Sequence, residues 1–186
     1  MLDAGSMTRL ARIGLFAVIF LCSTGFDQAS KEWARTELVP HHVTPAIAVG
    51  AASWSWQLEQ NPGAAFSSFV GRGDPRVVPW LFGALAVIAI AFAVRAATRS
   101  AARLPVIGYA LVAGGALGNA IDRVRMGSVT DFVRWSLRAH VWPIFNVADV
   151  ALVIGIVLVA FGHLRRGAIR PRNPRREPAT RSHMTG

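Results

Sequence analysis

Residues 104–123 read LPVIGYALVAGGALGNAIDR, an apolar run that ends in polar and charged side chains. The 18 residues of 104–121 carry no charge. As a helix rising about 1.5 Å per residue they extend about 27 Å, at the short end of what crosses a bilayer core. Gly114 and Gly118 lie four residues apart, a spacing typical of close contact between membrane helices. The stretch therefore predicts a transmembrane helix packed against a neighbour.

Three other apolar runs repeat this pattern, at residues 10–26, 79–96 and 147–164. Over the whole chain 53% of the residues are hydrophobic and 16% are charged. Long uninterrupted runs of this kind indicate membrane spans and not the core of a soluble domain. We therefore expect a mainly α-helical membrane protein in which residues 1–166 form one domain with four transmembrane helices.

The first run has an alternative interpretation as a cleaved secretory signal, because Arg9 and Arg12 precede an apolar stretch. The residues that follow it, Asp27, Lys31 and Glu32, resemble the end of a functional helix more than a small-residue cleavage site. We therefore interpret this run as a permanent span.

Cys22 is the chain's one cysteine, so the chain forms no internal disulfide. As a lipid-attachment site it would need small residues before it, but Phe20 and Leu21 are bulky and three further spans follow. We interpret Cys22 as an inert thiol that faces lipid or a neighbouring helix.

Basic residues divide unequally between the two ends of such a bundle. One end carries 12 of the 20 Lys and Arg residues, opposed only by Asp3 and Glu177, whereas the other end carries the remaining eight and eight acidic residues. The 12 are Arg9, Arg12, Arg95, Arg99, Arg103, Arg165, Arg166, Arg170, Arg172, Arg175, Arg176 and Arg181. This positive-inside pattern predicts that both termini are cytoplasmic, with a contribution from anionic membrane lipids. The net charge of +10 is thereby explained without nucleic-acid binding.

The segment 27–78 is too long for a bare loop between packed spans. Within it, Ser53, Ser55 and Gln57 alternate with Trp54, Trp56 and Leu58, the period of a half-exposed strand. Tryptophans are typical of the membrane–water interface. We expect an extracytoplasmic cap with a small β element and short helical pieces, lying on the interface over the bundle. Residues 167–186, rich in Arg and Pro, predict a disordered basic tail in the cytoplasm.

Polar side chains from four separate parts of the chain gather at the outer end of the predicted bundle. Ionisable and amide groups in this setting are functional candidates by default. They are Asp27, Lys31, Asn61, Asn119, Asp122, Arg123, Asp131, Asn146 and Asp149. Residues that served only to hold helices together would not need to share one depth.

Each of these residues also has a structural interpretation. Asp27 and Lys31, four apart, share a helix face and would form an ion pair or simply end a solvated helix. Arg123 could anchor its helix among the lipid headgroups, on the same face as Asn119. Only their joint placement favours a functional site.

The remaining candidates are equally ambiguous when taken singly. Asn61 and Gly63 flank a proline and predict a turn. Asn146 and Asp149 lie on one face at the start of the fourth span, where the helix dipole favours an acidic residue. Asp131 is an acid among mostly apolar neighbours.

Five segments resemble the motifs of the lipoprotein signal peptidase (signal peptidase II) family. They are DQASK at 27–31, NPGAAFS at 61–67, GGALGNAIDR at 114–123, GSVTDF at 127–132 and FNVAD at 145–149. They occur in the family's order and at compatible spacing, and the resemblance covers about residues 10–164. Residues 40–56 match no motif, and the arginine-rich tail has no evident counterpart.

The resemblance implies an aspartic endopeptidase of the bacterial inner membrane, with its active site at the extracytoplasmic face. Its substrates would be prolipoproteins whose cysteine already carries diacylglycerol, cut just before that cysteine. Asp131 and Asp149 correspond to the catalytic pair. Residues that correspond to substrate-binding or supporting positions are Asp27, Lys31, Asn61, Gly63, Asn119, Asp122, Arg123 and Asn146. Apart from substrate and membrane lipids we expect no partner, so the enzyme would work as a monomer.

The chemistry of two neighbouring carboxylates agrees with this assignment. They cannot both ionise cheaply, so one keeps a proton near neutral pH. The ionised one can take a proton from the attacking water while the protonated one polarises the scissile carbonyl. Which of the two starts protonated is a property of the pair.

A metalloprotease and a proton-coupled transporter are the alternative classes of function. The histidines form no H-E-x-x-H motif, so we expect neither a metal site nor a cofactor. A small proton-coupled transporter would also use Asp, Lys and Arg in the membrane. It predicts ionisable residues throughout the membrane depth, whereas here they gather at one end.

Overall fold

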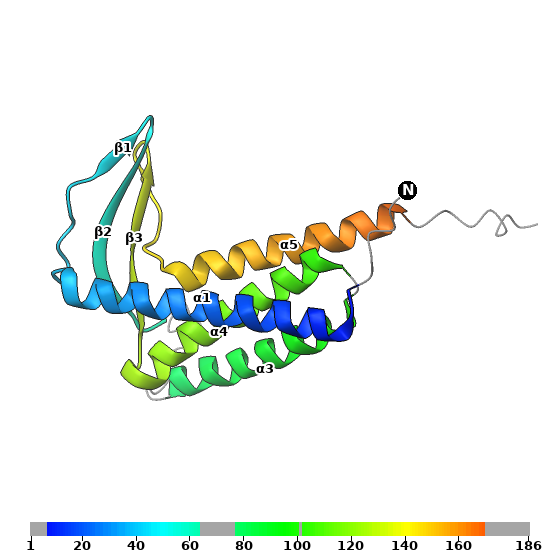
Figure 1. The fold of residues 1–186 in the computed structure, drawn as a ribbon. Helices are drawn as coiled ribbons and strands as arrows, with labels where there is room; N and C mark the ends of the chain where they lie inside the picture. Colours follow the sequence, from blue (N-terminus) through cyan, green and yellow to red (C-terminus); the bar gives the residue numbers. More distant parts are fainter. Residues whose placement is uncertain (1–6, 64–76, 101, 170–186) are drawn as a thin grey trace, which may run out of the picture.

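The computed structural model describes residues 7–63, 77–100 and 102–169, and Figure 1 shows their arrangement. Four long helices lie side by side: α1 (Arg9–Glu37), α3 (Val77–Arg99), α4 (Arg103–Met126) and α5 (Val147–Ile169). All four are long and apolar enough to cross a membrane, which confirms the expected four candidate spans.

Helix α4 is the centre of the bundle and packs against α1, α3 and α5. Over half of its most apolar 18-residue window (56%) is buried, compared with 6% for α1, 11% for α3 and 22% for α5. Glycines allow the close approach: a Cβ on Gly108 would lie 2.7 Å from the carbonyl oxygen of Gly155 on α5, and one on Gly114 would collide with Ser23 on α1. The exposed flanks of the outer helices are therefore the surface that contacts lipid.

Helix α1 continues well past the predicted end of the first span at residue 26. Thr8 caps its start by accepting a hydrogen bond from Ala11 N, and the helix ends at Glu37. Its outer turns bury Asp27, Lys31 and Ala34 on one face. Because the charged pair in this face has partners inside the protein, the helix can extend beyond the apolar run that the sequence marks as its span.

The other ends differ less from expectation. Helix α5 includes residues 167–169, which the sequence assigns to the tail. The rest of the predicted tail, 170–186, and residues 64–76 of the expected cap lie outside the described residues.

The β element is an antiparallel sheet of four strands in the order β1-β2-β3-β4. Its strands are β1 (Ile47–Val49), β2 (Ala52–Asn61), β3 (Val129–Leu137) and β4 (His140–Val141). Trp33, near the end of α1, packs the sheet against the bundle. Its ring is edge-on to those of Trp56 and Phe132, with ring centres 5.5 and 6.1 Å away.

The sheet lies at the opposite end of the bundle from the start of α1 and the end of α5, and stands out sideways from it (Figure 1). A bulge between Trp56 and Glu59 of β2 interrupts its pairing with β3 opposite Phe132, the residue after Asp131. Bulges redirect side chains and are common next to active sites.

Candidate active site

Asp131 lies near the start of β3, with only 3% of its surface exposed. Asn61, the last residue of β2, donates from Nδ2 to Asp131 Oδ2 at 2.9 Å. The orientation of this amide is fixed by Gly63, whose backbone N–H donates to Asn61 Oδ1 at 2.9 Å. Gly63 has a φ of 89°, a conformation that only glycine adopts readily. The turn at residues 61–63 therefore points one N–H of Asn61 at the carboxylate.

Asp149 lies in the first turn of α5, where it forms a reciprocal cap with Asn146. Asn146 N donates to Asp149 Oδ2 at 3.2 Å, and Asp149 N donates to Asn146 Oδ1 at 3.1 Å. This is the capping-box arrangement with Asn and Asp in the two positions. The helix start thus holds the Asp149 carboxylate in place.

Asn146 joins the two aspartates. Its side chain is fully buried, and its Nδ2 donates to Asp131 Oδ1 at 2.6 Å. Because Asn146 Oδ1 accepts from the backbone N–H of Asp149, the NH₂ group of Asn146 must face Asp131. One residue therefore contacts both carboxylates, one from β3 and one from α5.

Asn119 on α4 serves Asp149 in the same way. Its Nδ2 donates to Asp149 Oδ1 at 2.9 Å. Its Oδ1 accepts from Lys31 Nζ at 2.8 Å, and since an ammonium can only donate, this contact fixes the orientation of the amide. Lys31 thus acts on Asp149 through Asn119.

Lys31 is the centre of a buried ion cluster behind the site. Its Nζ lies 2.9 Å from Asp27 Oδ2 and 3.5 Å from Asp122 Oδ2, and all three side chains are at most 1% exposed. Asp27 also accepts from the backbone N–H of Ala148 at 2.8 Å, so α1 supplies a cap to the start of α5. Asp122 accepts from Thr130 N at 2.9 Å and so holds the start of β3.

Arg123 places a cation beside both aspartates. Its guanidinium lies 4.1 Å from the centre of the Phe82 ring, and its Nη1 donates to Asn119 O at 3.4 Å. The negative charges of Asp149, Asp131 and Asp122 all favour its charged form, with Asp149 contributing most. A cation so placed can stabilise negative charge that develops on a substrate between them.

Burial raises the pKa of Asp131 to about 6, and the nearby negative charge of Asp149 acts in the same direction. The hydrogen bonds from Asn61 and Asn146 and the charge of Lys31 oppose this rise. A carboxyl group with this pKa can both hold and release a proton near neutral pH.

All ten residues expected at the site lie at the sheet end of the bundle, linked by these contacts. Sequence reasoning missed Arg35 and Thr130. Arg35 Nη1 donates to Thr130 Oγ1 at 3.0 Å and lies 3.6 Å from Asp122 Oδ1. Arg35 lies about two turns of α1 after Asp27, on the same side of the helix. A prediction that extended this helix to residue 37 would have placed Arg35 among the site candidates.

In the parts of the chain that the structure describes, no three His, Cys, Asp or Glu side chains gather as metal ligands would. The carboxylates of the site are instead hydrogen-bonded to amides and backbone N–H groups.

Comparison with known proteins agrees with the geometry. Residues 19–165 match the family model described as Signal peptidase (SPase) II. The chain belongs to the signal peptidase II family. It is therefore a lipoprotein signal peptidase, an aspartic endopeptidase, and its substrates are prolipoproteins.

Relatives of this signal peptidase II come from several bacteria. The lipoprotein signal peptidase of Xanthomonas euvesicatoria pv. vesicatoria is 38% identical over 149 residues, which cover 78% of this chain and 83% of the relative. The lipoprotein signal peptidase of Xylella fastidiosa is 33% identical over 162 residues, which cover 86% of this chain and 94% of the relative.

Two solved structures of bacterial membrane enzymes, obtained by the in meso method at 1.9 and 2.3 Å resolution, share the fold. The first has a TM-score of 0.68 at 26% sequence identity, and the second a TM-score of 0.70 at 25% identity. The matches cover 82% and 87% of this chain, and 94% of each solved chain. This signal peptidase II is thus a multi-pass bacterial membrane enzyme, and the transporter alternative is set aside.

Proposed function

We propose that Asp131 and Asp149 are the catalytic pair of this signal peptidase, with Asp149 as general base and Asp131 as general acid. The observation that carries the proposal is Asn146, which contacts both carboxylates at once. The division of roles follows from the surroundings. Burial favours the protonated form of Asp131, so Asp131 serves as the acid and its partner Asp149 as the base.

In the first step Asp149 takes a proton from water, and the water oxygen bonds to the carbonyl carbon of the scissile peptide. Asp131 gives its proton to the carbonyl oxygen as that oxygen gains electrons. In the second step the carbon–nitrogen bond breaks, and the proton on Asp149 passes to the leaving amine. The new carboxyl group forms as its hydroxyl proton returns to Asp131, so the enzyme ends as it began.

The polar residues around the pair would position it. Asn61 and Asn146 each donate a hydrogen bond to Asp131, and Asn119 donates one to Asp149. These bonds would keep both carboxylates oriented toward the reacting atoms. Arg123 would stabilise the negative charge on the carbonyl oxygen. Exclusion of water by the packed sheet and helices strengthens both effects.

The substrate would meet the site at the extracytoplasmic face of the inner membrane, with both termini of the enzyme in the cytoplasm. The unequal distribution of arginine supports this orientation. A cysteine carrying diacylglycerol lies where acyl chains meet water, so the bond just before it reaches the outer end of the bundle. The site is contained within one chain, which supports a monomeric enzyme.

A gel-shift assay with purified prolipoprotein tests this proposal. We expect the wild type to cleave the diacylglyceryl-modified substrate and to leave the unmodified one intact. Asp131→Asn and Asp149→Asn should fold, because Asn has the same shape and keeps the acceptor for Asn146 while losing only the one for Asn61 or Asn119, but should not cleave. Near-normal cleavage by either variant would show that the pair is wrongly assigned. Equal cleavage of both substrates would remove the diacylglyceryl requirement while leaving the pair in place.

A further inference from the structure

Arg35 is a second cation beside the buried ion cluster of Asp27, Lys31 and Asp122. Its side chain is 18% exposed. Nε and Nη2 donate to Glu32 Oε2, at 3.2 and 2.8 Å, on the surface of α1. Nη1 instead donates to Thr130 Oγ1 at 3.0 Å and lies 3.6 Å from Asp122 Oδ1. One guanidinium therefore links the protein surface to the buried cluster.

The cluster is electrically neutral only when Arg35 is counted with it. Asp27 and Asp122 are two acids, whereas Lys31 is a single cation. With Arg35 there are two cations and two acids, and none of the four side chains is more than 18% exposed. Charges this far from water are costly unless they are paired. Arg35 therefore balances a charge that Lys31 leaves over.

The two oxygens of Asp122 show where this second cation is needed. Oδ2 accepts from Thr130 N at 2.9 Å and lies 3.5 Å from Lys31 Nζ. Oδ1 is buried and accepts no hydrogen bond from the residues that the structure describes. A buried acceptor without a donor is unfavourable. The positive charge of Arg35, 3.6 Å away, compensates this oxygen.

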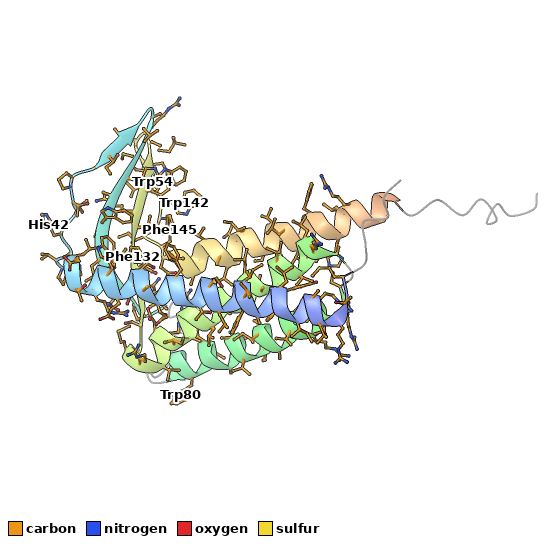
Figure 2. All side chains as sticks on the ribbon, viewed as in Figure 1. His42, Trp54, Trp80, Phe132, Trp142 and Phe145 are labelled. Atoms are coloured by element: carbon orange, nitrogen blue, oxygen red, sulfur yellow. The ribbon has the colours of Figure 1, made fainter. Side chains whose placement is uncertain are left out.

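The cluster lies against the start of β3, the strand that carries Asp131. Thr130, the residue before Asp131, accepts a hydrogen bond from Arg35. Phe132, the residue after it, packs on α1 at the base of the sheet (Figure 2). Successive side chains of a strand point to opposite faces. Strand β3 thus presents Thr130 and Phe132 to α1, and Asp131 to the site on its other face.

Charges on several elements act on Asp131. The negative charge of Asp149 on α5 raises its pKa, whereas the positive charge of Lys31 on α1 lowers it. Arg123 on α4 interacts with the same carboxylate, and the register of β2 places Glu59 opposite Asp131. Because Lys31 acts from within the cluster, the net charge of the cluster also reaches Asp131. A cluster with one negative charge in excess would favour the protonated carboxyl group.

We propose that Arg35 is a positioning residue of the peptidase reaction, whose positive charge keeps the buried cluster neutral and so sets the pH range in which Asp131 exchanges its proton. Arg35 makes no contact with either aspartate of the pair. It acts through the charge of Asp122 and through strand β3. This inference rests on the proposed catalytic pair, because it concerns how Asp131 titrates.

Substitutions that separate charge from hydrogen bonding test the inference. Arg35→Met removes both, Arg35→Lys keeps the charge, and Thr130→Val removes only the hydroxyl that Arg35 binds. For each purified variant, kcat and KM are measured in detergent on a diacylglyceryl-modified prolipoprotein from about pH 5 to about pH 9. Circular dichroism checks that each variant is folded.

For Arg35→Met we expect the fall of kcat/KM at high pH to move upward by about one pH unit, because a nearby positive charge is lost. Arg35→Lys and Thr130→Val should keep the wild-type pH profile. A merely structural contact would lower stability without this separation. Should Arg35→Met fail to fold, Arg35→Gln removes the same charge while keeping a donor for Thr130.

An unmoved profile in the folded neutral variant would overturn the inference, and so would an equal move in Arg35→Lys or Thr130→Val. Either result would leave the catalytic pair in place, provided that Asp131→Asn is inactive. Cleavage by Asp131→Asn at the wild-type rate would instead overturn the pair, and the role of Arg35 with it. The two failures are therefore distinguished by separate variants.

Discussion

Three asparagines each direct an amide N–H to one of the two aspartates, and in each the orientation is fixed by a group that can only donate. Gly63 N–H fixes Asn61, Lys31 Nζ fixes Asn119, and Asp149 N–H fixes Asn146. A carboxylate that accepts such bonds is held in one position before substrate arrives. Preorganised donors of this kind need not reorient during the reaction.

The pKa of Asp131 gives a prediction about pH. If Asp131 is the acid, it must be protonated, so kcat/KM should fall as the pH rises through its pKa of about 6. Asn61→Ala removes an N–H that stabilises the carboxylate, so the pKa should rise and the fall should move to higher pH. A pH–rate profile of both enzymes measures this. A rate that instead rises through pH 6 would make Asp131 the base.

Lys31 gives a prediction about stability. It is fully buried between Asp27 and Asp122, so Lys31→Met leaves Asp27 without its cation and Asp122 with only the more distant Arg35. Loss of one partner from a buried ion pair costs about 3–5 kcal/mol, which lowers the midpoint of thermal unfolding by about 6–20 °C. Unfolding in detergent, followed by circular dichroism, measures the shift.

Glu32→Gln is the matched control for Lys31→Met, one residue further along α1. Glu32 pairs with Arg35 at the surface, where its side chain is 65% exposed. Its loss should cost about 0–1 kcal/mol. Similar midpoints for the two variants would contradict the role given to the buried cluster.

At the level of elements, the site depends on how closely α1, α4 and α5 approach. Asp27 on α1 accepts from the first turn of α5, 121 residues away, and lies against Gly118 of α4. A side chain at position 118 would push Asp27 away from the α5 start that carries Asp149. The glycine is therefore as important to the geometry as the polar residues are.

Gly118→Ala tests this packing. Its Cβ would collide with the Asp27 carboxylate, so we expect a loss of about 1–3 kcal/mol in stability together with a lower kcat. Gly25→Ala on α1 is the control, since nothing lies within 4 Å of its Cβ. It should be neutral, or stabilise the helix by up to about 1 kcal/mol. Thermal unfolding and single-turnover cleavage would separate the two, and equal behaviour would contradict the argument.

The sequence predicts these elements unequally. The four helices follow from apolar runs, and the strand from alternation of Trp and Ser, because both are periodic signals within one segment. The last turn of α1, which carries Arg35, was missed because Arg35 has no evident partner in the sequence until Asp122 on α4 and Thr130 on β3 are known to lie beside it. The bulge next to Asp131 and the cap that Asp27 gives to α5 depend on contacts between distant segments, which no local pattern reports.

At the scale of the whole molecule, the described ends of the chain lie together and the sheet lies at the other end (Figure 1). Of the described arginines, the first of these ends holds Arg9, Arg12, Arg95, Arg99, Arg103 and Arg165, and the candidate site lies at the second. Charge thus supports one orientation of the bundle in the membrane. Family motifs give the site residues, but only the fold brings together side chains as distant as Asn61 and Asp131.

Reporter fusions measure this orientation. We expect green fluorescent protein fused after residue 186 to fluoresce, because that end would be cytoplasmic. Alkaline phosphatase fused after Pro40, between α1 and β1, should be active, because it needs an oxidising compartment to form its disulfides. The reverse pair of results would place the site on the cytoplasmic face and contradict the positive-inside argument.

The central claim, that Asp131 and Asp149 act as a unit, is tested most directly by combining their substitutions. Each single Asp→Asn variant should lose about a thousandfold or more in kcat/KM while keeping its unfolding midpoint. Because residues that act as a unit do not contribute additively, the double variant should be no slower than the slower single one. Losses that multiply, or a single variant with near-normal kcat/KM, would contradict the account.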